Sequence, residues 1–134
     1  MPHVVLTGAD HYPGHVVPST CHFVWLGNDF PWLNVLAVVS AAREGGFERV
    51  VLHADGAVVQ SPHFGVVQRL PNFELRGIDL GRLSAAAGLP IGKVQALYDN
   101  MTGPAARSDV LRALVLLGEG GVYLDVDTVT VGSF

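Results

Sequence analysis

Two short apolar runs on either side of a helical segment constrain the fold of this chain more than any other feature. Cys21–Leu26 and Arg49–Ala54 are rich in β-branched and apolar residues, and turn-forming residues follow each run, as is typical of buried strands. Between them, apolar side chains recur at helical spacing from Pro31 until Gly45-Gly46 ends the pattern. A strand, a helix and a second strand in this order predict an α/β fold built on a parallel sheet.

The same alternation is expected in the next part of the chain. Asp29 is positioned to cap the first helix, because its carboxylate can accept a hydrogen bond from a free backbone N–H. Val66–Leu70 and Phe73–Ile78 are expected to form short strands, and two short helices are expected between Leu80 and Met101.

The last part of the chain ends the predicted sheet. A helix is expected from Pro104 to about Leu117, because proline is favoured in the first turn and an apolar stripe follows. Glycines end this helix, and Val122–Leu124 follows as a short buried strand. Residues 1–15 are expected to form an irregular arm, and residues 16–134 a single domain.

Composition excludes several classes of protein. Hydrophobic residues make up 49% of the 134 residues, which is too apolar for a disordered tail. The net charge of −4 and the lack of a basic run argue against an ordinary nucleic-acid binder. Pro31–Ala42, the most apolar stretch, is shorter than the roughly 20 residues of a membrane span. The first residues do not resemble a signal peptide, so a cytoplasmic location is expected.

Polar residues follow three of the predicted strands. These are Asn28-Asp29, Asp55, and Asp125 with Asp127. Ligands of open parallel sheets bind outside the carboxyl ends of the strands, so these residues are candidates for a site. His22 and His53 lie inside apolar strands and are interpreted as core histidines.

The residues around the last strand suggest a specific chemistry. Asp125 and Asp127 at a strand end form a doubly anionic oxygen site, which suits Mg²⁺ or Mn²⁺ together with a diphosphate. Asp109 and Arg112 are three residues apart and therefore share one face of the preceding helix. Arginine can neutralise a leaving phosphate, and aspartate can accept hydrogen bonds from sugar hydroxyls.

Three segments in this order resemble the nucleotide-sugar-binding region of GT-A glycosyltransferases, which carries a DXD motif. The segments are Val17–Gly27, Ser108–Arg112 and Gly120–Asp127. Among such enzymes, the sequence is similar to α-mannosyltransferase-like and capsular-sugar transferases and to clostridial glucosylating toxins. The resemblance implies a Rossmann-like open sheet with flanking helices.

The resemblance also implies roles for individual residues. Asp109 would hydrogen-bond the donor sugar or ribose, and Arg112 would bind the sugar and phosphate side of the donor. Asp125 would contact the donor and the metal, and Asp127 would ligate the metal directly. Asp127, Arg112 and Asp109 are thus the expected catalytic residues, with Mn²⁺ or Mg²⁺ as cofactor.

Two further residues and the substrates follow from the same resemblance. Trp25 would stack on the nucleobase, with core packing as the alternative role for its indole, and Tyr123 would support the pocket. The donor would be a UDP- or GDP-sugar, transferred to the hydroxyl of an unknown glycan, lipid or protein with retention at the anomeric carbon. In GT-A enzymes the acceptor-binding half lies downstream, so this chain is expected to be a donor-binding part. A missing downstream half or a second copy of the chain would then cover its apolar faces.

Two alternative functions stay open at this point. A nucleotide-sugar and metal-binding module without turnover would need only the donor site. Leu124–Val129 also fits the motif of haloacid-dehalogenase-like phosphatases, in which Asp125 would be the nucleophile and Asp127 the acid/base. That motif normally opens its domain, whereas here it follows most of the chain.

Overall fold

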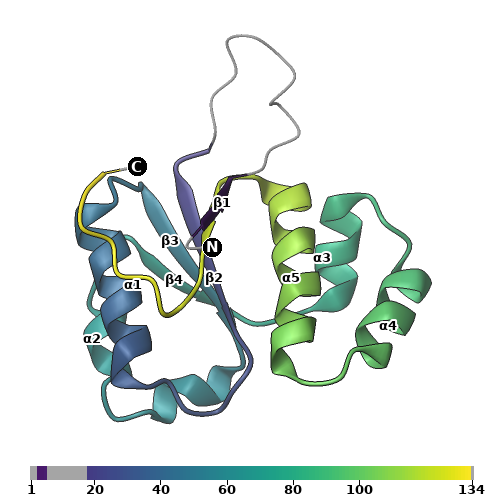
Figure 1. Ribbon diagram of the computed structural model, residues 1–134, viewed down its shortest axis with the longest axis horizontal. Coiled ribbons are helices and arrows are strands. Elements are labelled where there is room, and N and C mark those ends of the chain that lie inside the picture. Colours follow the sequence, from purple (N-terminus) through teal and green to yellow (C-terminus); the bar gives the residue numbers. More distant parts are fainter. Residues whose placement is uncertain (1–2, 6–17, 134) are drawn as a thin grey trace, which may run out of the picture.

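The chain folds into a five-stranded sheet with helices on both faces (Figure 1). A computed structural model describes the backbone of residues 3–5 and all of residues 18–133. The strand order is β1-β5-β2-β3-β4. The strands are β1 (His3–Val5), β2 (Thr20–Trp25), β3 (Arg49–Ala54), β4 (Phe73–Arg76) and β5 (Val122–Leu124). The last four run parallel to one another, and β1 pairs antiparallel with β5. The predicted α/β open sheet is confirmed.

Helices form a layer on each side of the sheet. One side carries α1 (Trp32–Glu44) and α2 (Phe64–Gln68), and the other carries α3 (Leu80–Ala87), α4 (Ile91–Asn100) and α5 (Pro104–Glu119) (Figure 1). A 3-10 helix, η1 (Gly56–Gln60), follows β3. Both predicted helices between Leu80 and Met101 are present, and α5 begins at the predicted proline.

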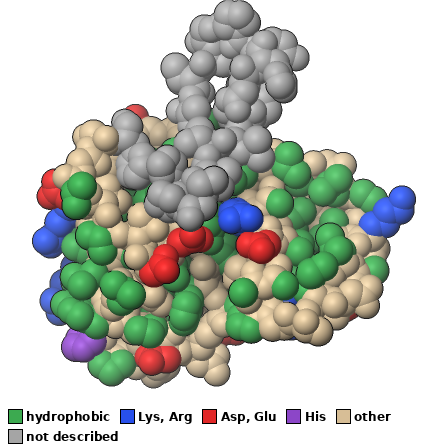
Figure 2. Space-filling view, in the orientation of Figure 1, with side chains coloured by type: hydrophobic (Ala, Val, Ile, Leu, Met, Phe, Trp, Pro, Cys, Tyr) green, Lys and Arg blue, Asp and Glu red, His purple; other side chains and the backbone are tan. Residues whose placement is uncertain are grey.

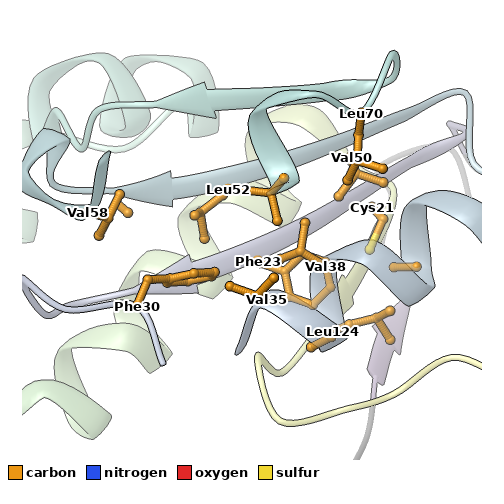
Figure 3. Packing of buried hydrophobic residues seen from close by; sticks show 14 of the residues in the cluster. Cys21, Phe23, Phe30, Val35, Val38, Val50, Leu52, Val58, Leu70 and Leu124 are labelled. Atoms are coloured by element: carbon orange, nitrogen blue, oxygen red, sulfur yellow. The ribbon is translucent and has the colours of Figure 1, made fainter. Parts of the chain in front are cut away.

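Two apolar clusters hold the layers together, because β2 and β3 are buried on both faces. Phe23, Val35 and Leu52 belong to the cluster between the sheet and α1 (Figure 3). Val24 and Leu111 belong to the cluster beneath α3 and α5. Strands of this kind carry continuous apolar runs rather than alternating ones, which is why they stand out in the sequence.

The connection from α5 to β5 depends on glycine. Gly120 and Gly121 both have positive φ angles, of 69° and 97°. A Cβ added to Gly121 would lie 2.5 Å from the carbonyl oxygen of Thr20 on the neighbouring strand. The close approach brings β5 beside β2, and so sets where the residues after β5 emerge.

Three local predictions are wrong. The strand expected over Val66–Leu70 is absent, and α2 covers residues 64–68 instead, because the buried side chains Phe64 and Val67 are three residues apart and share a helix face. Asp29 does not cap α1, whose N-cap residue is Pro31, with no side-chain cap. The expectation of an irregular arm fails for His3–Val5, which pair with β5. Residues 6–15 of that arm lie outside the described part of the chain.

Candidate functional site

A cavity of about 460 Å³ opens at the carboxyl ends of β2 and β5. Five of the six predicted site residues line it, and they come from β2, α5, β5 and the turn after β5: Trp25, Asp109, Tyr123, Asp125 and Asp127. The parallel arrangement of β2 and β5 places these strand ends side by side. The position agrees with the rule that ligands of open α/β sheets bind at the carboxyl ends of strands.

The sixth residue, Arg112, lies next to the cavity. Its Nη2 is 3.3 Å from Asp109 Oδ1, one helical turn earlier on α5. The guanidinium carbon is 5.6 Å from the centroid of the Tyr123 ring, within cation–π distance. Arg112 is therefore held between the carboxylate of Asp109 and the ring of Tyr123, two residues that line the cavity.

Electrostatics in the cavity are dominated by carboxylates. Burial raises the pKa of Asp125, and the negative charge of Asp127 raises it further, whereas Arg112 lowers it. Burial also raises the pKa of Tyr123, and the neighbouring Asp125 carboxylate raises it further. With Asp109, the site contains three carboxylates and a single nearby guanidinium, so a cation would relieve the repulsion between them. Figure 2 shows acidic and basic side chains side by side near the middle of this face, between α1 and α5.

The loop after β2 fixes the half-buried indole of Trp25. Its Nε1 donates a hydrogen bond of 2.6 Å to the carbonyl oxygen of Asp29. The ring meets Phe30 edge-on, with centroids 6.2 Å apart. Ser61 Oγ donates to the Asp29 carboxylate and accepts from the backbone N–H of Phe30, at 3.2 and 2.7 Å. One part of Trp25 packs on the core and another borders the cavity, so core packing does not account for the whole side chain.

The donor set of the cavity fits a magnesium or manganese ion. Asp125 and Asp127 supply hard oxygen ligands, and these ions commonly take few protein carboxylates and complete their coordination with water and phosphate oxygens. In the part of the chain that the structure describes, no three His, Cys, Asp or Glu side chains are grouped to hold a metal by themselves. The fit is therefore to an ion shared with a ligand, not to a closed structural site.

The remaining strand-end candidates lie outside this cavity. Asp55 lines a neighbouring cavity of about 420 Å³, together with Tyr98 of α4. Its carboxylate accepts a hydrogen bond of 2.8 Å from the backbone N–H of Ala57 and so caps η1. Leu26 lines both cavities and stands between them.

Sequence reasoning missed two polar residues of the site. Ser108 lines the cavity directly before Asp109. Asn34, in the first turn of α1, lines it from the opposite side and is 95% buried. A signal for Asn34 was present, because it occupies the same helix face as Ala37, Val38 and Ala41, which is otherwise apolar and buried.

The fold and cavity define an α/β protein with an acidic ligand site at the carboxyl edge of its sheet. Residues 44–134 match the family described as the glycosyltransferase sugar-binding region containing a DXD motif, and the chain belongs to this family. The matched residues include Asp109, Arg112, Asp125 and Asp127. The family match places Asp125 and Asp127 in the region that carries a DXD motif and gives no support to the phosphatase alternative.

Two comparisons with longer proteins agree with this assignment. The chain is 25% identical, over 135 aligned residues, to a protein named "Toxin" from Photorhabdus asymbiotica subsp. asymbiotica; the match covers 94% of this chain and 4% of that protein. It is similar in fold to the structure named "PaToxG Glycosyltransferase", with a TM-score of 0.60 and 20% sequence identity. That match covers 94% of this chain and 48% of the solved chain. The chain thus spans about half of one relative and a small part of the other. Among the described residues, no helix is long and apolar enough to cross a membrane.

Proposed function

We propose that this chain binds a nucleoside-diphosphate sugar in the cavity beside β5 and takes part in transfer of the sugar to an acceptor hydroxyl. The observation that carries the proposal is the convergence of Trp25, Asp109, Asp125 and Asp127 on one cavity. A sheet of this type, an aromatic ring and an acidic strand end suit a ligand that contains a base, a diphosphate and a sugar.

Each side chain has a role in this proposal. Trp25 offers its exposed indole face to the nucleobase. Asp125 and Asp127 hold a Mn²⁺ or Mg²⁺ ion, which supplies positive charge for the diphosphate when it is bound. Asp109 accepts hydrogen bonds from hydroxyls of the donor, and Arg112, already oriented by Asp109 and Tyr123, stabilises charge on the departing diphosphate.

The reaction breaks the bond between the anomeric carbon and the diphosphate oxygen and forms a bond to the acceptor oxygen. The proton of the acceptor hydroxyl passes to the departing diphosphate as the new glycosidic bond forms. Retention at the anomeric carbon is part of the proposal and rests on the resemblance to the family. A module that binds the donor without turnover is the second candidate, because the cavity alone would suffice for donor binding.

Calorimetry with UDP- and GDP-sugars, each with and without Mn²⁺, tests donor binding. We expect metal-dependent binding of at least one donor, and its loss in Asp127→Ala and Arg112→Ala with folding retained. Asp99→Ala, an exposed aspartate of α4, is the matched control for loss of a carboxylate.

Two outcomes of this experiment separate the candidates. Metal-independent binding that neither substitution changes would contradict the proposed site. Donor binding without any release of sugar, to water or to an added acceptor, would favour the binding module.

A further inference from the structure

The side-chain amide of Asn34 is a buried polar group that the described structure leaves without a hydrogen-bond partner. Asn34 is 5% exposed, and its Nδ2 has no partner among the described residues. The backbone N–H of Asn34 is already used, because it donates to the carbonyl oxygen of Pro31 at 2.9 Å. A buried amide of this kind is destabilising, and in native proteins it usually indicates a water, ion or ligand that completes it.

The position of Asn34 in α1 makes the amide harder to explain by folding alone. Ala37, Val38 and Ala41 continue its helix face, and all three are buried in the cluster between α1 and the sheet. Leucine at position 34 would continue the apolar stripe and remove an unsatisfied polar group from the interior. Stability alone therefore favours an apolar residue where the chain has asparagine.

The surroundings of Asn34 indicate which ligand its amide suits. Asn34 lines the same cavity as Asp125 and Asp127 and comes from the opposite helical layer to Asp109. A cavity with three carboxylates favours a hydrogen-bond donor over an acceptor, and the unpartnered Nδ2 of Asn34 is such a donor. A cation bound by these carboxylates would attract phosphate oxygens into the cavity. An NH₂ group that also lines the cavity can donate a hydrogen bond to one of those oxygens.

We propose that the Asn34 side chain donates a hydrogen bond to the diphosphate of the bound nucleotide, opposite the Asp125–Asp127 turn. The inference rests on the proposed function and adds to it a neutral donor that holds the diphosphate from the α1 side. Ligand binding by Asn34 then explains why the chain has a polar side chain at a position where it weakens the fold.

Asn34→Leu separates the two roles, because it keeps the branching and the number of heavy atoms of the side chain and removes the donor. Binding of UDP and GDP, and of the nucleosides uridine and guanosine, is measured by calorimetry in Mn²⁺, with thermal unfolding of the same samples. We expect affinity for the diphosphate that the parent binds to fall about tenfold or more, since a hydrogen bond to a charged oxygen is lost. Thermal stability should be equal or higher, and nucleoside binding and Mn²⁺ binding without nucleotide should be unchanged.

Asn72→Leu is the matched control. Its amide donates to the carbonyl oxygens of Ala42 and Phe47 at 3.1 and 3.2 Å, at the amino end of β4. This variant should lose thermal stability and keep the diphosphate affinity of the parent chain. If Asn34→Leu does not fold, Asn34→Ala replaces it in the same measurements.

Three results would overturn the assignment. Unchanged diphosphate affinity in Asn34→Leu would show that the amide does not contact the ligand. An equal loss for nucleosides, or weaker binding of Mn²⁺ alone, would show that Asn34 acts on the base site or on the carboxylates. If the parent chain binds no nucleoside diphosphate, the proposed function itself fails, and that result is distinct from parent binding that Asn34→Leu leaves intact.

Discussion

The buried histidine pair predicts a steep loss of stability in mild acid. His22 Nδ1 and His53 Nε2 are 2.9 Å apart on adjacent strands, and both side chains are almost fully buried. The second ring nitrogen of His53 has no partner among the described residues. Burial lowers the pKa of His22 to about 4 and that of His53 to about 3, from 6.5. Both rings are therefore neutral in the folded protein at pH 5.

The charges around the pair do not reverse this effect. Glu119 raises the pKa of His22, whereas Arg76 and Arg49 lower it. His22, Arg76 and Arg82 all lower the pKa of His53. The guanidinium of Arg76 is itself held by Glu119 and Glu74, each at 2.8 Å.

The magnitude follows from the difference in proton uptake between the two states. Because the folded pKa values lie below the unfolded ones, the stabilisation is fully present above about pH 6.5 and is lost as the pH falls towards 4. At pH 5 the unfolded chain holds nearly two protons that the folded chain does not. The slope is then about 2.7 kcal/mol per pH unit, and the loss between pH 7 and pH 5 is about 4 kcal/mol. A loss of this size is a large part of the stability of an ordinary domain.

Urea unfolding at pH 7, 6 and 5 measures this loss. In His53→Gln the loss between pH 7 and pH 5 should shrink by about 2 kcal/mol, because one titrating group is gone. His63→Gln, at an exposed position, controls for removal of a histidine. A change of less than 1 kcal/mol in the parent chain, or the full parental loss in His22→Gln/His53→Gln, would refute the reasoning.

Three substitutions test other parts of the structure. Arg112→Ala should lower nucleoside-diphosphate affinity about tenfold or more. Its unfolding free energy should fall by less than about 1 kcal/mol, because Asp109, the ion-pair partner, is largely exposed. A large loss of stability with intact affinity would show a structural role instead. Gly121→Ala should destabilise the chain by about 2–4 kcal/mol in urea unfolding, because the new Cβ would meet the carbonyl oxygen of Thr20 and φ is positive. Gly92→Ala, with open space around the new Cβ, should not destabilise it. Equal stabilities of the two variants would disprove the close approach. Arg76→Met should lower the urea midpoint, because it leaves the partly buried Glu119 without its arginine; an unchanged midpoint would show that the pair contributes nothing.

The strands and long helices could be predicted because the spacing of apolar residues and the turn residues that bound each segment indicate the same element. Cys21–Leu26 is apolar except for His22, since helices cover both faces of β2. The prediction of a strand over Val66–Leu70 was wrong because five residues are too few to distinguish a helical period from a strand. Tertiary packing of Phe64 and Val67 makes this part of the chain helical. The prediction that Asp29 caps α1 was wrong because other side chains use its oxygens. Its carboxylate accepts a hydrogen bond from Ser61, and its carbonyl oxygen accepts one from Trp25.

The acidic half of the site was predictable, and the α1 side was not. Asp109, Arg112, Asp125 and Asp127 lie in segments whose spacing indicates shared helix faces and strand ends. Asn34 is distant from them in sequence, and only the packing of α1 across β2 places it on the same cavity. A buried polar residue in an apolar stripe was its signal, but the stripe alone does not show what the amide faces.

If the proposed function holds, the cavity beside β5 binds a nucleoside diphosphate through a divalent cation shared with Asp125 and Asp127. The most direct measurement is the free Mn²⁺ concentration, followed by electron paramagnetic resonance, in titrations with and without UDP or GDP. Because the two ligands share one site, each should tighten binding of the other by the same factor, and Asp127→Ala should abolish the coupling. Equal Mn²⁺ affinity with and without either nucleotide, in a chain that binds that nucleotide, would contradict the account.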